Sequence, residues 1–453
     1  MLSFYKKFIL RLQEIDLFNL GVVFGVWYGV AYFLVPLAIG LGLRSTYLRA
    51  IVEHELFLYS WQYFGIAALG IVSFGLGFWL ISRKSKRVKP VFAELNPISL
   101  KFLFVLTYGA GLVVKILKVL TGTYFHLGKN PAVAQSLYSA LLGIGEWLGI
   151  LGLGIGFGLY FSLRKQNKPE FIFWQRLIYG VFALELVYNF FTLSKMSLLA
   201  PLAAYLITRH YVWQKDLRHM LAWAFIFQFL LAPLQSRLNV PQVLQSYVAS
   251  WEKKVIPQTV VGAPVAQSLP PALVKPLAAM DFVADGVFAR LDQSRILAKI
   301  LFYNTGFSYG KGLENFFISL GPPRFLWLAK PLVNAGHNEF GRAYHILDPS
   351  DYTTSVGPGI VGDWYLNFGV PGVLLGLFLL GALVAFIILY LMTGGPTIYN
   401  VAAYGVLVLM IMHAVEGWIG PGFAEIAKQS VIMLLVYFAG QNYSKIALWL
   451  RKS

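Results

Sequence analysis

Residues 366–392 read LNFGVPGVLLGLFLLGALVAFIILYLM, a long and almost wholly apolar run. No charged side chain interrupts it, and it exceeds the roughly 20 residues that a helix needs to cross about 30 Å of hydrocarbon. Its apolar residues are continuous and do not alternate with a period of two, which favours a helix over a strand of a barrel. We therefore interpret it as a transmembrane helix.

Similar apolar runs recur along the 453 residues, which are 58% hydrophobic and 13% charged, with a mean hydropathy of +0.65. A soluble domain cannot bury that much apolar surface. We expect an all-α polytopic membrane protein with about ten or more transmembrane helices. The fifth and sixth, joined at Ser194–Ser197, could instead form a hairpin that does not cross fully. The predicted spans lie near 17–41, 58–82, 98–118, 135–162, 174–193, 197–208, 219–236, 366–392, 398–416 and 428–446.

Basic residues predict the orientation of these spans. Connections on one predicted side carry eighteen lysines and arginines, whereas the short connections on the other side carry five. Short cytoplasmic loops are enriched in Lys and Arg, so we expect both termini in the cytoplasm. The net charge of +17 is then explained mostly by the basic cytoplasmic loops, and we expect no nucleic acid partner. Residues 1–16 lack a small-residue cleavage site, which favours an interfacial stretch over a removed signal peptide.

The spans divide the chain into three predicted parts. Residues 1–236 form an N-terminal bundle of about seven spans, and residues 366–453 form a C-terminal bundle of about three. Residues 237–365 form a large extracytoplasmic loop with short helices. Within it, GVFARLDQSRILAKILFY (286–303) predicts an amphipathic helix with Asp292, Arg295 and Lys299 on one face.

The loop is basic on the side of the membrane where positive charge is otherwise scarce. Arginine suits phosphate because its planar fork makes paired, charge-assisted hydrogen bonds. A cluster of this kind fits a lipid-linked diphosphate, although a solvated loop face that pairs with its own acids explains the same pattern. The basic residues are Arg290, Arg295, Lys299, Lys311, Arg324, Lys330 and Arg342, and the acids are Asp292, Glu314 and Glu339.

Four residues are candidates for activating a hydroxyl group, which requires titration near neutral pH. They are His337 and Glu339 in GHNEFG, Asp363 in GDWYLNFG, and Glu416 at the outer end of its span. Each could instead hold the loop together through hydrogen bonds.

Several further residues have a predicted role beside these candidates. Lys195, in an outer turn, could add a cation, and Tyr344 and Tyr365 could contact a sugar. Ionisable residues inside the spans (Lys115, Glu146, Glu185 and His413) suit either a proton relay or internal pairing. The chain has no cysteine and no metal-binding or nucleotide-binding motif, so we expect no metal and no cofactor.

Two motifs in the loop resemble those of the Wzy-type oligosaccharide repeat-unit polymerases, which make O-antigen and related surface polysaccharides. The first is a Pro–Arg–aromatic–Trp–Lys–Pro stretch, found here from Pro323 through Trp327 to Pro331. The second is an acidic–x–Tyr–x–Asn–Phe–Gly entry into the next helix, found here from Asp363 to Gly369, with aspartate where glutamate is common. SKMSLLAPL (194–202) resembles the small–basic–small turn of the family.

The resemblance implies a metal-independent membrane glycosyltransferase of the GT-C type in the inner membrane of a bacterium, with the loop in the periplasm. Its donor and acceptor would be undecaprenyl-diphosphate-linked oligosaccharides, and its leaving group undecaprenyl diphosphate. A co-polymerase that sets chain length and a flippase would be its protein partners. Two alternatives remain open, an O-antigen ligase that transfers glycan to lipid A core and a transporter of the lipid-linked oligosaccharide.

Overall fold

The computed structural model describes residues 16, 18–41, 48, 51–52, 54–83, 91–120, 137–191, 195–213, 292–304, 306–322, 327, 330–331, 336–351 and 356–450. Every regular element in these residues is a helix, and eight of the helices are long and apolar enough to cross a membrane. The predicted fold class is confirmed. The chain is a multi-pass integral membrane protein.

The eight long helices follow most of the predicted spans. The structure differs at α17, which begins at Gly359 and not near 366, and at α19, which begins at Ile419 and not near 428. The predicted span at 197–208 corresponds to α9 (Lys195–Thr208), which continues directly into a π-helical turn, Arg209–Trp213. The predicted span at 219–236 lies outside the described residues. The long helices are α2 (Leu20–Gly40), α4 (Trp61–Ser82), α5 (Pro97–Leu120), α7 (Leu137–Lys165), α8 (Phe171–Phe191), α17 (Gly359–Met392), α18 (Ile398–Glu416) and α19 (Ile419–Leu450).

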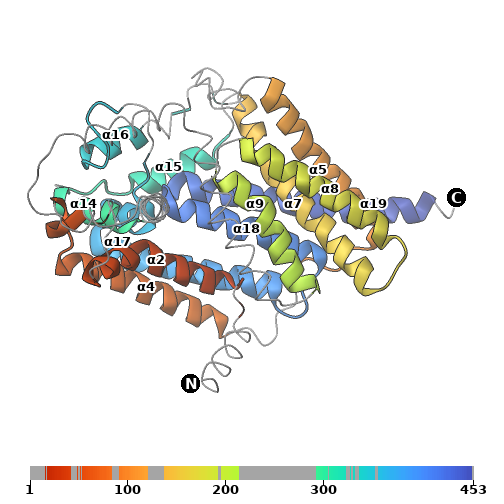
Figure 1. Cartoon of the computed structure of the whole chain (residues 1–453), viewed down its shortest axis with the longest axis horizontal. Coiled ribbons are helices and arrows are strands. Elements are labelled where there is room, and N and C mark those ends of the chain that lie inside the picture. The colour runs from red at the N-terminus through yellow and green to blue at the C-terminus, as the bar shows by residue number, and fades with distance from the viewer. Residues whose placement is uncertain are drawn as a thin grey trace, which may run out of the picture.

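The helices form two packed groups (Figure 1). In one, α17 lies along α4, and both contact α2; in the other, α5, α8 and α9 pack around α7. The helix α18 contacts both α7 and α17 and joins the groups. The core lies at α18 and α7. In the most apolar 18-residue stretch of each helix, 83% of the residues of α18 and 78% of those of α7 are buried.

Glycine allows the closest helix contacts. A Cβ atom on Gly77 of α4 would lie 2.0 Å from the backbone oxygen of Phe378, and one on Gly381 of α17 would lie 2.0 Å from that of Phe74. The two backbones therefore touch, as small residues permit in membrane helix pairs.

A break divides α17 near its start. Gly369 has φ 65° and ψ −151°, a backbone conformation that favours glycine, and Pro371 follows two residues later. Proline has no backbone N–H to donate, and its ring clashes with the carbonyl group four residues earlier. The nearby carbonyl oxygen of Leu366 accepts a hydrogen bond from the backbone N–H of Ser308 at 2.8 Å. The first turns of α17 thus form a short helical piece tied to the loop.

Four ionisable residues inside the spans pair with one another across helices. Lys115 of α5 forms a buried ion pair with Glu185 of α8, whose side chains are 7% and 3% exposed. Asn189 donates to the other oxygen of Glu185 at 3.1 Å. One turn along α5, Lys118 pairs with Glu146 of α7. Internal pairing therefore accounts for these four charges.

Three short helices lie together at one end of the bundle, on the left of Figure 1. They are α14 (Ser294–Tyr303), α15 (Lys311–Leu320) and α16 (Gly336–Ala343). The predicted amphipathic helix at 286–303 is present from residue 294, and the residues before 292 lie outside the described part. We call this end of the bundle the α14 end.

Candidate functional site

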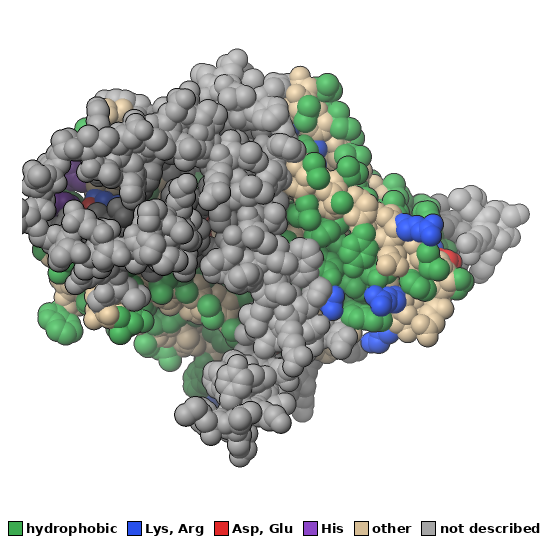
Figure 2. Space-filling model, in the orientation of Figure 1, with side chains coloured by type: hydrophobic (Ala, Val, Ile, Leu, Met, Phe, Trp, Pro, Cys, Tyr) green, Lys and Arg blue, Asp and Glu red, His purple; other side chains and the backbone are tan. Residues whose placement is uncertain are grey.

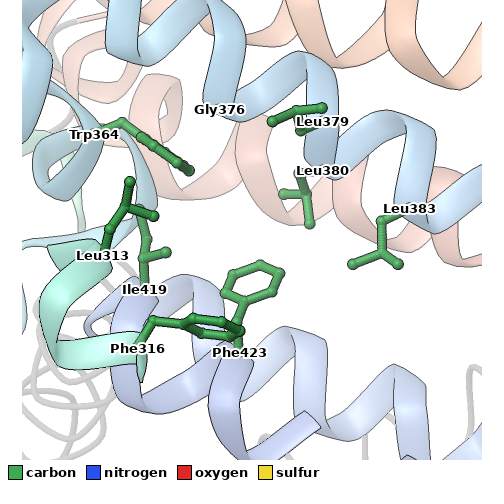
Figure 3. Close-up of a pocket in the computed structure, with 9 residues that line it drawn as sticks. All are labelled: Leu313, Phe316, Trp364, Gly376, Leu379, Leu380, Leu383, Ile419 and Phe423. Atoms are coloured by element: carbon green, nitrogen blue, oxygen red, sulfur yellow. The ribbon is translucent and has the colours of Figure 1, made fainter. Parts of the chain in front are cut away.

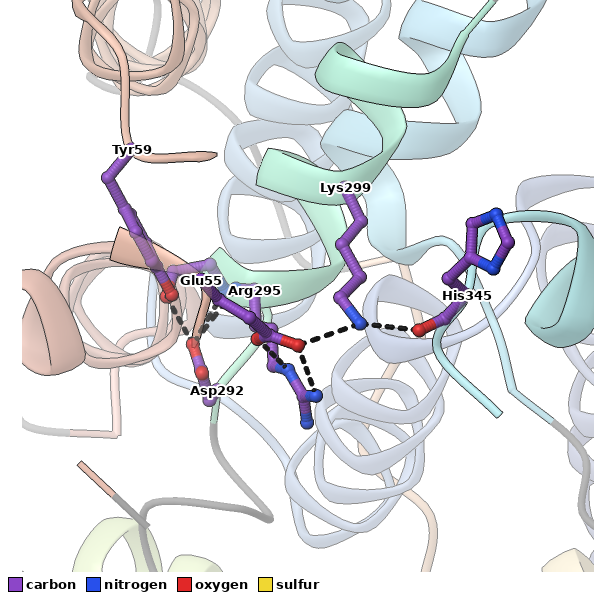
Figure 4. A network of polar contacts seen from close by, with 7 residues as sticks. Glu55, Tyr59, Asp292, Arg295, Lys299 and His345 are labelled. Atoms are coloured by element: carbon purple, nitrogen blue, oxygen red, sulfur yellow. Dashed lines mark hydrogen bonds and ion pairs between the residues drawn. The ribbon is translucent and has the colours of Figure 1, made fainter. Parts of the chain in front are cut away.

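The densest polar contacts described at the α14 end join the start of α14 to the connection between α2 and α4 (Figure 4). Oppositely charged side chains meet there from segments about 240 residues apart in the sequence. We call this group the α14 network. It comprises Glu55, Tyr59, Asp292, Ser294, Arg295, Lys299 and the backbone carbonyl of His345.

Glu55 is the acidic centre of the α14 network. Arg295 donates from Nη2 to Oε1 of Glu55 at 2.6 Å, and its Nε donates to Oε2. Lys299, one helical turn further along α14, places Nζ 2.9 Å from Oε1 of the same carboxylate. It also donates to the carbonyl of His345. One carboxylate is therefore held by a two-pronged guanidinium contact and by an ammonium group.

Asp292 organises the start of α14. Its Oδ1 accepts from the backbone N–H groups of Ser294 at 2.9 Å and Arg295 at 3.2 Å, which have no partner inside the helix. A carboxylate at a helix N-terminus is also favoured by the helix dipole. The Ser294 hydroxyl donates to Asp292 and lies 3.1 Å from the Tyr59 hydroxyl.

Burial and ion pairing shift the pKa values of residues in the α14 network in opposite directions. Burial opposes the charge on Glu55, but hydrogen bonds and attraction from Arg295 and Lys299 outweigh it and hold the pKa of Glu55 below 4.5. For Lys299 burial prevails over its bond to Glu55 and lowers the pKa of the ammonium. Burial, with the nearby Asp292, raises the pKa of Tyr59, which stays a neutral hydroxyl.

The charged members of the α14 network differ in exposure. Figure 2 shows histidine, basic and acidic side chains toward the left of the view, in the region where Figure 1 places α14. The side chain of Arg295 is 33% exposed, whereas those of Glu55 and Lys299 are 15% and 6% exposed. Arg295 is thus the most accessible member of this charged triad.

Asp363 and Asn367 tie three helices together near the start of α17. Asp363 is fully buried, and its two oxygens accept hydrogen bonds from Ile419 N at 2.8 Å and Asn367 Nδ2 at 2.9 Å. Asn367 Oδ1 in turn accepts from Gly312 N, near the start of α15, at 2.8 Å. In the structure Asp363 therefore joins the start of α17 to the start of α19.

An apolar groove of about 210 Å³ begins next to this tie (Figure 3). It lies between α15, α17 and α19 and extends along α17 away from the α14 end. Its lining carries no charged side chain. The lining residues are Leu313, Phe316, Trp364, Gly376, Leu379, Leu380, Leu383, Ile419 and Phe423.

The first turns of α17 face α14 and also line the start of the groove. Gly362 faces α14, since a Cβ atom there would lie 2.6 Å from Cδ1 of Ile300. Trp364, two residues on, lines the groove. The first turns of α17 therefore adjoin both α14 and the groove.

The predicted site residues are divided among several places. Arg295 belongs to the α14 network. Tyr344 lies nearby, with its hydroxyl 3.3 Å from Oδ1 of Asn304 at the end of α14, and burial raises the pKa of this phenol. Arg342 donates to the carbonyl of Asp351 at 3.1 Å, and Glu339 is exposed on α16.

Other predicted residues have structural contacts. Lys330 donates to the carbonyls of Gly321 and Pro322, each at 3.1 Å. Tyr365 is 8% exposed and accepts from Gln62 at 3.5 Å. Glu416, at the end of α18, accepts from Trp27 Nε1 at 3.4 Å.

Four predicted residues cannot be placed by their side chains. Arg290 and Arg324 lie outside the described residues. The backbones of His337 and Lys195 belong to α16 and to the start of α9, but their side chains are outside the described part. The roles predicted for these four residues stay predictions.

Sequence reasoning missed Glu55 and Asn367 as candidate site residues. Glu55 stands in a short connection without a motif, and its partners lie 240 positions away, so spacing could not reveal the contact. In the sequence, Asn367 stands out only as part of the motif Asp363–Gly369. Its hydrogen bonds with Asp363 and Gly312 explain why an asparagine fits this buried position.

Comparison with models of protein families, with curated proteins and with solved structures finds no match to this chain.

Proposed function

We propose that this protein is a membrane glycosyltransferase that polymerises polyprenyl-diphosphate-linked oligosaccharide repeat units. The growing chain on its lipid diphosphate would be the donor, and a single lipid-linked repeat would be the acceptor. Transfer of the glycan forms a glycosidic bond to the acceptor hydroxyl and breaks the bond to the diphosphate, which leaves on its lipid. The motif resemblance around Pro323–Pro331 and Asp363–Gly369 is one support for this proposal.

The observation that carries the proposal is that the first turns of α17 adjoin both an apolar groove and the helix α14, which carries the charged α14 network. The groove, with its uncharged lining, suits part of an isoprenoid tail inside the bilayer. Arg295 and Lys299, on α14, supply donors of the kind that bind phosphate. Positive groups near a leaving diphosphate stabilise the charge that develops during transfer.

Residues for hydroxyl activation have unequal support. Asp363 is buried with both oxygens engaged, so its contacts favour a positioning role. Glu416 and Glu339 are less enclosed and remain candidates for the base, together with His337.

Disruption of the encoding gene in its own cells tests the proposal. Loss of a polymerase leaves surface glycan with a single repeat unit, because ligation to lipid A core continues. Loss of a ligase leaves no repeat on the core. Normal long-chain polymer in the disrupted cells would contradict both.

A further inference from the structure

The carboxylate of Glu55 is bound by a set of hydrogen-bond donors that also suits a phosphate group. Arg295 approaches its carboxylate through two nitrogen atoms, Nε and Nη2, and Lys299 Nζ lies 2.9 Å from Oε1. A guanidinium fork and an ammonium group that together surround two oxygen atoms form the arrangement typical of phosphate recognition. The carboxylate therefore resembles, in position and charge, two oxygens of a bound phosphate.

The two acids of the α14 network differ in their attachment. Asp292 is committed to the start of α14, where it accepts from two backbone N–H groups. Glu55 instead belongs to the connection before α4, in which the neighbouring Leu56 and Phe57 are 48% and 60% exposed. The segment packs against α14 through Phe57, whose ring meets that of Phe302, but the Glu55 carboxylate itself is held by Arg295 and Lys299.

We propose that Glu55 is an internal counter-anion, which a diphosphate group displaces from Arg295 and Lys299. The lipid-bound source of that diphosphate rests on the function proposed above. A phosphate group carries more negative charge than one carboxylate, so the exchange strengthens the attraction to the two cations. The 33% exposed side chain of Arg295 gives the incoming anion its first contact, and Lys299, 6% exposed, lies deeper.

Titration of inorganic pyrophosphate into the purified protein in detergent, followed by calorimetry, tests this exchange. Glu55→Gln removes the competing charge, and we expect about tenfold tighter binding, equivalent to about 1.4 kcal/mol. Arg295→Gln should abolish binding. Glu314→Gln is the matched control, because it removes one negative charge from an exposed position of α15 and should leave the affinity unchanged.

Three results would overturn the inference. Unchanged or weaker binding by Glu55→Gln would mean that Glu55 only holds α14 in place. Absence of binding in both the wild type and this variant would mean that no anion site exists there. If Glu55→Gln fails to fold, Glu55→Asp replaces it, because aspartate keeps the charge but reaches less far toward Arg295 and Lys299. A pyrophosphate affinity of Glu55→Asp equal to that of the wild type would also contradict the inference.

The probe separates this inference from the proposed function. If Glu55→Gln binds pyrophosphate more tightly but the protein does not elongate lipid-linked repeats, the anion exchange is supported and the polymerase proposal is contradicted. Elongation by a protein whose pyrophosphate affinity does not respond to Glu55→Gln would do the reverse.

Discussion

The carboxylate of Asp363 accepts a hydrogen bond from the backbone N–H of Ile419, with 2.8 Å between Oδ2 and N. This bond joins the first turns of α17 to the first residue of α19. The adjacent Ile419 side chain lines the apolar groove, and Trp364, next to Asp363, lines its other side. The mouth of the groove is therefore held by a buried polar contact between two membrane helices.

Replacement of Asp363 by Asn should destabilise the protein. The amide keeps one oxygen acceptor, so in a buried place either Ile419 N loses its partner or Asn367 Nδ2 loses one of its two acceptors. An unsatisfied buried donor costs about 1–3 kcal/mol, which thermal unfolding in detergent would detect. Glu314→Gln, at an exposed position of α15, is the control and should leave the unfolding temperature unchanged. An Asp363→Asn variant with wild-type stability and no transfer activity would instead identify Asp363 as the base.

Replacement of Gly77 by Ala should separate α4 from α17. The new Cβ atom would lie 2.0 Å from the backbone oxygen of Phe378, so the helices must move apart. Overpacking of this kind costs about 1–3 kcal/mol. Gly75→Ala, on the same helix, is the control, because nothing lies within 4 Å of its Cβ position. Equal unfolding temperatures for the two variants would contradict the close contact of the backbones.

The stabilisation from Glu55 should disappear in acid. Its pKa in the folded protein lies below the ordinary 4.5, so the carboxylate stabilises the fold above that pH. The contribution falls as the pH drops through the folded pKa, when Glu55 becomes protonated and leaves Arg295 and Lys299 without their counter-charge. We expect the gap in unfolding temperature between wild type and Glu55→Gln to narrow between pH 5 and pH 3, roughly the range where a carboxyl titrates. A gap that stays constant over this range would refute the assignment.

Filling the apolar groove should weaken use of the lipid-linked donor. Leu379→Trp places a larger side chain in the groove, and we expect about a tenfold rise in KM, equivalent to about 1.4 kcal/mol of binding. Leu375→Trp is the matched control, because Leu375 lies on the same helix, is 59% exposed and does not line the groove. An equal effect of both substitutions would show that the groove does not hold the tail.

The sequence predicts most of the long helices because uninterrupted apolar runs are the strongest signal in a membrane protein. The start of α17 was missed for a physical reason. Its first turns carry Asp363 and Asn367, which look like loop residues until their buried hydrogen bonds are known. The predicted span at 197–208 also corresponds to a helix, α9, which continues into the π-helical turn Arg209–Trp213.

The candidate site was less predictable than the fold. Spacing of four correctly placed Arg295 and Lys299 on one face of α14, because that relationship is local. Their shared partner Glu55 is 240 positions away from Arg295, and no local pattern encodes such a contact. The predicted chemistry of the remaining basic residues depends on tertiary contacts of the same kind.

Elongation of a defined lipid-linked repeat by the purified protein tests the central claim most directly. The protein, in detergent and without a membrane gradient or added nucleotide, would be incubated with one polyprenyl-diphosphate-linked repeat unit, and the products resolved by length. We predict a ladder of longer chains together with released polyprenyl diphosphate. A folded protein that binds the substrate but leaves every molecule at one repeat unit would contradict the proposal.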